Sequence, residues 1–195
     1  MPFRDGTQVD VEEIGDTDWR VLREMFYQGT HQSFIVPAGA TTDFASVPRV
    51  LVWFLPRYGR YTRAAILHDH LWRKLVPAGV LSLPEADGIF RRAMRELGVP
   101  FLRRWIMWGA VRLGALKKPG GRTSWIRDSW PVLPLALLTL PIVGPPAIVV
   151  LISLALFTVV EFIAYLPLRL AKAVRSARGE PVKAVNVPTL DWKTS

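Results

Sequence analysis

Residues 64–75 read "AAILHDHLWRKL", and this stretch decides the fold of the first part of the chain. One histidine and three apolar side chains recur in it at helical spacing: Ala64, His68, Leu71 and Leu75. Residues at this spacing share one face of a helix. The stretch therefore predicts an amphipathic helix whose imidazole points into a core.

A second predicted helix supplies a partner for that imidazole. Asp87 shares a face with Phe90 and Met94, where a carboxylate is costly to desolvate unless another group pairs with it. We expect the two helices to pack antiparallel, with Asp87 accepting a hydrogen bond from His68. The other ring nitrogen would then be free to act as a base, and His68 and Asp87 would form a catalytic dyad. The alternative is a buried pair that only holds the two helices together.

The remaining patterns predict an α+β fold, in which a short antiparallel β-meander precedes three packed helices. Strands are expected over residues 8–14, 19–27 and 32–37, followed by a loop with one helical turn near residues 50–54. Helices are expected over residues 62–75, 83–97 and 101–116. The second helix opens with the capping box of Ser82 and Glu85 and stops at Gly98.

Composition excludes several classes of site. The 195 residues include no cysteine, which removes disulfides, thiolate nucleophiles and cysteine-ligated zinc. No G-x-S-x-G, P-loop or G-x-G-x-x-G motif is present, so serine hydrolase, NTPase and dinucleotide-binding sites have no support. The net charge is +9, and residues 61–195 carry 19 Lys and Arg against 8 Asp and Glu.

The C-terminal part predicts a membrane segment. Residues 147–168 carry a single charge, Glu161, and a helix of this length spans the roughly 30 Å hydrocarbon layer. A shorter apolar run precedes it, and Gly144, Pro145 and Pro146 lie between the two. We expect a transmembrane helical hairpin over residues 130–168 that turns at these residues. The alternative is the core of a soluble helical domain.

Basic residues flank this predicted hairpin on both sides. Before it lie Arg112, Lys117, Lys118, Arg122 and Arg127, and after it lie Arg169, Lys172, Arg175, Arg178 and Lys183. Because Lys and Arg mark the cytoplasmic side, both ends are expected there, and the N-terminus lacks the apolar core of a signal peptide. The predicted location is the cytoplasmic membrane, with the N-terminal domain in the cytoplasm. Membrane lipids are the expected partners of the basic residues, in preference to nucleic acid.

Four segments follow from these patterns. We expect a cytoplasmic α+β domain over residues 1–118, a basic linker over 119–129, the hairpin over 130–168 and a basic, polar tail over 169–195.

A second acidic group beside His68 suggests a cation site. Asp69 is displaced by about 100° around the helix from His68 and is free to bind a cation. Asp43, or the carbonyls of residues 40–47, could complete an oxygen-rich shell suited to calcium. The alternative is that Asp43, Ser46 and Pro48 form an ordinary turn.

Three segments resemble a known family. "TTDFASVPR", "YTRAAILHDHLWR" and "EADGIFRRAMRELGV" are similar to domain of unknown function family 1353, over roughly residues 34–114. The family is common in phages and prophages, so the resemblance implies such a source and other phage proteins as possible partners. It implies no activity.

A weaker resemblance implies an activity. Secreted phospholipases A2 have a calcium loop, then a helix with His-Asp-x-x-Tyr, then a second helix whose Asp orients the His. Carried over, His68 would be the general base, Asp87 its orienting carboxylate and Asp69 a calcium ligand. Trp72 stands where the motif has Tyr, and the disulfides are absent.

Two functions are therefore expected. The first is a membrane-anchored, calcium-assisted hydrolase of lipid or ester substrates. The second is a non-catalytic, membrane-attached virion or host-takeover component in which His68, Asp69 and Asp87 are structural.

Overall fold

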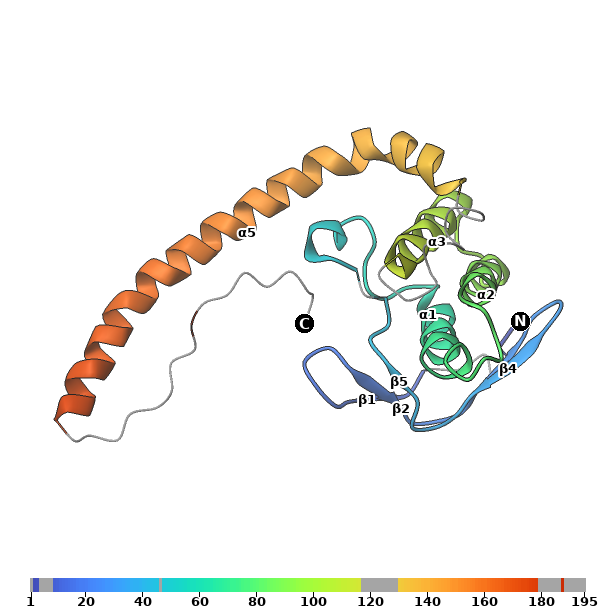
Figure 1. Cartoon of the computed structure of the whole chain (residues 1–195), viewed down its shortest axis with the longest axis horizontal. Coiled ribbons are helices and arrows are strands. Elements are labelled where there is room, and N and C mark those ends of the chain that lie inside the picture. The colour runs from blue at the N-terminus through green and yellow to red at the C-terminus, as the bar shows by residue number, and fades with distance from the viewer. Residues whose placement is uncertain (1, 4–8, 46, 117–129, 179–186, 188–195) are drawn as a thin grey trace.

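The computed structural model describes residues 2–3, 9–45, 47–116, 130–178 and 187. Within these ranges the chain forms a small α+β domain followed by one long helix (Figure 1). The α+β prediction is confirmed. The predicted basic linker and most of the predicted tail lie outside the described residues.

Five short strands form two antiparallel sheets. β1 (Val11–Glu13) pairs with β2 (Trp19–Val21), which pairs in turn with β5 (Thr41–Thr42). β3 (Met25–Gln28) and β4 (Ser33–Val36) form a separate hairpin. The sequence predicted one meander with a single strand over residues 19–27. That strand is interrupted because residues 22–24 are all exposed, which breaks the alternation that a half-buried strand requires.

Helix α1 (Thr62–His70) lies at the centre of the domain. It contacts β4 and β5 on one side and α2 on the other. Ala64, Ile66, Leu67 and Leu71 are almost completely buried. The helix continues as the π-helical turn η2 (Leu71–Leu75), in which the amide of Val76 donates to the carbonyl of Leu71 at 2.9 Å. The predicted helix over residues 62–75 is therefore present, with a widened last turn.

Helix α2 (Leu83–Glu96) has well-defined ends. Its capping box is formed as predicted, because the Ser82 hydroxyl accepts from the Glu85 amide while the Glu85 carboxylate accepts from the Ser82 amide. At the other end Gly98 has φ +71°, and Val99 donates to the carbonyl of Met94 at 2.9 Å. This is a Schellman motif, which glycine favours at that position.

Helix α3 (Phe101–Ala115) follows Pro100 and packs against α2. A 3-10 turn, η1 (Arg49–Leu51), lies in the loop before α1, close to the predicted turn near residues 50–54. The start of the last helix packs against both η1 and α3. At Gly109 of α3 a Cβ atom would meet Val132 and Leu135 at 3.6 Å, so the two helices are closely packed there.

The predicted hairpin is wrong. Helix α5 (Val132–Ala177) is one continuous helix of 46 residues (Figure 1). Pro141, Pro145, Pro146 and Pro167 lie inside it, and Gly144 is not among the glycines with positive φ. Proline fixes φ near a helical value and bends a helix without reversing it, whereas a chain reversal needs several non-helical residues. The helix accordingly bows along its length.

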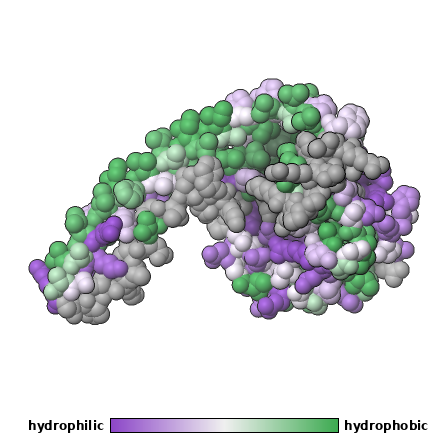
Figure 2. All heavy atoms as spheres, in the orientation of Figure 1, coloured by the Kyte–Doolittle hydropathy of each residue, from purple (hydrophilic) through white to green (hydrophobic). Residues whose placement is uncertain are grey.

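The face of α5 seen in Figure 2 is largely apolar, and many large apolar side chains along the helix are exposed. It is the one helix among the described residues that is long and apolar enough to cross a membrane, and none of its most apolar 18-residue window is buried. A soluble core helix would be covered by other elements. Within the described residues, this segment is therefore not the core of a soluble domain.

Two glycines, one inside α2 and one just after its end, should respond in opposite ways to alanine. A Cβ atom at Gly88 would meet nothing within 4 Å, so Gly88→Ala should raise the free energy of unfolding by about 0.5–1 kcal/mol. Gly98→Ala should lower it by about 1–2 kcal/mol, because an L residue is strained at positive φ. Urea unfolding of the full chain in neutral detergent, followed by tryptophan fluorescence, measures both. Equal effects in the same direction would contradict the assignment of the Gly98 cap.

Candidate functional site

Helix α1 sends its two adjacent polar residues in different directions. His68 faces α2, and Asp69 faces β5 and the loop that follows it. Successive residues on a helix are about 100° apart, so one helix can serve two sites. The two residues belong to separate clusters, which we call the buried triad and the Asp69 network.

The buried triad consists of His68, Asp87 and Arg112. His68 Nε2 lies 2.8 Å from Asp87 Oδ1, and Arg112 Nη1 donates to Asp87 Oδ2 at 3.1 Å. Asp87 is fully buried, and the side chain of Arg112 is 1% exposed. The His68 ring also packs against the ring of Phe90 in a tilted arrangement, with ring centroids 4.8 Å apart. The predicted contact between His68 and Asp87 is present.

Arg112 is the member of the triad that sequence reasoning missed. It was assigned to the basic flank that would meet lipid or nucleic acid, but its burial prevents either contact. A signal was available in the sequence. Arg112 follows Trp105 and Trp108 and precedes Ala115 at helical spacing, and Trp108 and Ala115 are both buried. A basic residue on a buried face requires a buried carboxylate, and Asp87 supplies it.

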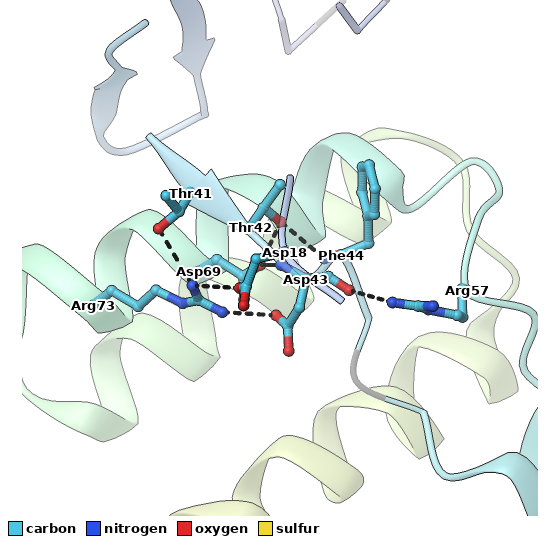
Figure 3. A network of polar contacts seen from close by, with 8 residues as sticks. All are labelled: Asp18, Thr41, Thr42, Asp43, Phe44, Arg57, Asp69 and Arg73. Atoms are coloured by element: carbon cyan, nitrogen blue, oxygen red, sulfur yellow. Dashed lines mark hydrogen bonds and ion pairs between the residues drawn. The ribbon is translucent and has the colours of Figure 1, made fainter. Parts of the chain in front are cut away.

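The Asp69 network consists of Asp18, Thr41, Thr42, Asp43, Asp69 and Arg73 (Figure 3). The hydroxyl of Thr42 and the amide of Asp43 both donate to Asp69 Oδ2. Arg73 lies one helical turn further along. Its Nη2 donates to Asp43 Oδ1 at 3.1 Å, and its Nη1 lies 3.3 Å from Asp18 Oδ1. The network therefore ties helix α1 and its π-helical turn to the sheet of β1, β2 and β5.

The pKa of Asp69 is raised well above its usual value of 3.8. Burial is the main cause, and the negative charge of Asp43 adds to it. The hydrogen bond from Thr42 and the charge of Arg73 act in the opposite direction without reversing the shift. Asp69 therefore retains its proton to a higher pH than an exposed aspartate.

The loop after β5 contains a turn on Thr42. The amide of Phe44 donates to the Thr42 hydroxyl at 2.9 Å, which is the bond of a Ser/Thr turn. Phe44 is buried with φ +59°, which is uncommon for a residue other than glycine. Arg57 supports the turn from outside, because its Nη2 donates to the Asp43 carbonyl at 3.4 Å. The predicted turn of Asp43, Ser46 and Pro48 stays a prediction, because Ser46 lies outside the described residues.

Asp43 and Asp69 do not fit a calcium ion as they are arranged. A calcium shell needs several oxygen atoms directed at one point. Here the carboxylates receive a guanidinium, a hydroxyl and an amide, which are all hydrogen-bond donors. Among the described residues no group of three or more His, Asp and Glu side chains is placed to hold a metal. The calcium site remains a prediction from the sequence, and no chemical step is derived from it.

Comparison with known proteins identifies the central part of the chain. Residues 19–111 match the family described as "Protein of unknown function (DUF1353)". The DUF1353 region covers slightly less than half of the 195 residues and contains Asp43, His68, Asp69 and Asp87. It ends one residue before Arg112 and excludes α5. Comparisons with curated proteins and with solved structures give no match, so the resemblance to phospholipase A2 gains no support.

Removal of the arginine from the buried triad should be strongly destabilising. Arg112→Met removes the guanidinium from the buried carboxylate of Asp87, and we expect a loss of about 3–5 kcal/mol in the free energy of unfolding. The double variant Arg112→Met with Asp87→Leu should recover most of that loss, because it removes the charge that is left unpaired. Urea unfolding in detergent measures both, with the exposed Arg60→Met as a control that changes the same charge. A loss below about 1 kcal/mol for Arg112→Met would contradict a structural role for the triad.

The raised pKa of Asp69 predicts a pH-dependent loss of stability. Between 3.8 and the higher pKa of the folded state, the folded chain binds a proton that the unfolded chain has lost. The free energy of unfolding should therefore fall as the pH rises through that window. Asp69→Asn does not titrate and can still accept from Thr42, so the stability of the wild type relative to this variant should decline from about pH 4 upward. Urea unfolding of both chains over a pH series measures the difference, and a flat difference would contradict the raised pKa.

Proposed function

We propose that the chain is a membrane-attached, non-catalytic component in which α5 crosses the bilayer once and holds the DUF1353 region at the membrane. The observation that carries this proposal is the exposure of α5. The helix contains an 18-residue window that is strongly apolar, and no part of that window is covered by the rest of the described chain. Such a surface is stable in lipid and unfavourable in water.

The length of α5 supports a single crossing. At about 1.5 Å per residue the helix is roughly 69 Å long, more than twice the hydrocarbon thickness. Its first turns pack against α3 near Gly109, and basic residues begin at Arg169. This leaves residues 147–168 as the segment that lies in the hydrocarbon. Hydroxyl groups within the helix are satisfied internally, since Ser153 and Thr158 each donate to the carbonyl four residues earlier at 2.9 Å.

We place the membrane attachment at the cytoplasmic membrane, with the DUF1353 region on the cytoplasmic side. The domain precedes α5 in the chain, and a domain folds as a unit during synthesis. The folded domain would therefore stay on the cytoplasmic side, and the segment after Ala177 would be moved to the other side of the membrane. Basic residues flank the helix at both ends and would contact anionic lipid heads. The family resemblance is what points to a phage or prophage source and to other phage proteins as partners.

The buried triad favours the non-catalytic alternative over the hydrolase. Both oxygens of Asp87 are occupied, one by His68 and one by Arg112, and the three groups lie between α1, α2 and α3. This arrangement neutralises a buried charge and joins three helices. The calcium-assisted hydrolase of lipid or ester substrates remains a prediction from the sequence, since the donors around Asp43 and Asp69 are those of a structural network.

Single-cysteine labelling tests the number of crossings. The chain has no cysteine, so each introduced thiol is the one that reacts. Asp16→Cys is exposed in the turn between β1 and β2, and Ser176→Cys is exposed near the end of α5. With a single crossing, a membrane-impermeant maleimide added to sealed right-side-out vesicles should label Ser176→Cys and leave Asp16→Cys unlabelled. Inside-out vesicles should give the reverse pattern.

The same measurement separates the alternatives. Labelling of both thiols from one side would contradict a single crossing and restore the hairpin topology. Recovery of the chain in the soluble fraction would contradict membrane attachment itself. The matched control is Leu156→Lys with Phe157→Lys, which places two charges near the centre of the proposed span at about 2.5–3.5 kcal/mol each and should release the chain from the membrane.

A further inference from the structure

A cavity that belongs to neither the buried triad nor the Asp69 network lies between α2 and α3. Its volume is about 370 Å³. Its lining is basic and aromatic, and consists of His31, Gly88, Arg91, Arg92, Arg95, Phe101, Arg104 and Trp105. None of these lining residues is acidic, so four guanidinium groups surround the space without a carboxylate among them.

The four arginines are not neutralised by ion pairs within the described part of the chain. No ion pair joins Arg91, Arg92, Arg95 or Arg104 to any described carboxylate. Glu96, the carboxylate next to Arg95 in sequence, accepts instead from the Tyr27 hydroxyl and the Thr30 hydroxyl, each at 2.9 Å. Gathered like charges repel one another, and a bound anion would remove that repulsion.

Aromatic rings hold two of the guanidinium groups in place. The Arg91 guanidinium lies 4.1 Å from the centroid of Trp105, and that of Arg104 lies 5.1 Å from the centroid of Phe101. Stacking on a ring leaves the edge of a guanidinium free to donate hydrogen bonds. The arginines are therefore ordered before any ligand arrives, which lowers the entropic cost of binding.

Gly88 leaves one wall of the cavity open. It lies one helical turn before Arg91 and Arg92 on α2, and a Cβ atom there would meet nothing within 4 Å. A larger side chain at this position would project into unfilled space beside the arginines.

We propose that this cavity is a binding site for a phosphate-bearing anion. Arginine suits phosphate because its planar fork donates two parallel hydrogen bonds to phosphate oxygens. The volume is enough for a phosphate with a small organic substituent. Two kinds of ligand supply such a phosphate group: the headgroup of an anionic phospholipid and a free phosphate.

Occupation of the cavity by a lipid headgroup rests on the membrane attachment proposed above. Binding of phosphate in the cavity does not rest on it. Arg104 and Gly109 lie on the same helix, about 7.5 Å apart along its axis, and Gly109 is where α5 packs against α3. The basic cavity is therefore close to the start of the membrane helix.

Calorimetry on the full chain in neutral detergent tests the site independently of membrane crossing. The probes are inorganic phosphate and glycerol 3-phosphate. We expect saturable binding that weakens about tenfold or more in the double variant Arg95→Gln with Arg104→Gln. Arg60→Gln, an exposed arginine outside the cavity, should leave the affinity unchanged. Absence of binding in the wild type, or an equal loss in Arg60→Gln, would overturn the proposal.

A second variant keeps every charge and changes the shape of the cavity. Gly88→Leu should fill it and weaken phosphate binding about tenfold or more. Gly114→Leu, at another helical glycine with open space around it, is the matched control and should bind like the wild type. Wild-type affinity in Gly88→Leu would overturn the assignment to this cavity. Binding of a duplex oligonucleotide without binding of either phosphate would also overturn it, in favour of nucleic acid.

The two sources are distinguished by repeating the phosphate titration in nanodiscs. If the headgroup occupies the cavity, phosphate should bind at least about tenfold more weakly in phosphatidylglycerol discs than in phosphatidylcholine discs. Equal affinity in the two discs would overturn the headgroup as source and assign a free phosphate. A chain that binds phosphate in detergent but does not enter nanodiscs would contradict the membrane attachment and leave the site intact.

Discussion

The carboxylate of Asp87 is fully buried, and the packing of the three helices of the domain depends on how its charge is compensated. An unpaired charge there would cost several kcal/mol. Helix α1 supplies His68 and helix α3 supplies Arg112, and each binds one of the two oxygens. The three helices can therefore pack in only one register, since a shift by one residue would separate at least one partner from Asp87. Apolar contacts around the triad add stability, but they specify the register less strictly than directed hydrogen bonds do.

Helix α1 also holds the strands in position, through Asp69, the residue next to His68. Asp69 accepts from Thr42 and Asp43, and Arg73 contacts Asp18 and Asp43. The sheet of β1, β2 and β5 has only short strands and few ladder bonds, so it is weak by itself. The Asp69 network compensates for that weakness. A His-Asp pair that resembles a catalytic motif in the sequence acts here as two separate attachments on two sides of one central helix.

The sequence predicted the parts of this arrangement that depend on local periodicity. The helices over residues 62–75, 83–97 and 101–116, the capping box at Ser82 and the contact of His68 with Asp87 all follow from helical spacing and from the cost of burying a charge. Arg112 was missed because a basic residue near a basic, membrane-flanking segment was assigned by its neighbours in sequence and not by its helical face. The predicted hairpin is wrong because a pair of prolines does not by itself reverse the chain, and proline is compatible with a bent helix in lipid. The division into two sheets depends on long-range pairing of β2 with β5, which alternation within one strand cannot indicate.

Within the described part of the chain, the basic residues lie in several different environments. On α3 alone, Arg112 is buried against Asp87, Arg104 lines the cavity beside α2, and Gly109 between them receives the start of α5. A net charge of +9 suggests a single electrostatic partner, such as a lipid surface or a nucleic acid. Burial shows that one of these charges serves the fold, and the cavity lining, in which no described residue is acidic, is the basis for assigning four others to an anion. The function of a basic residue in this protein is therefore set by the face of the helix on which it lies, and a count of charges along the sequence does not reveal it.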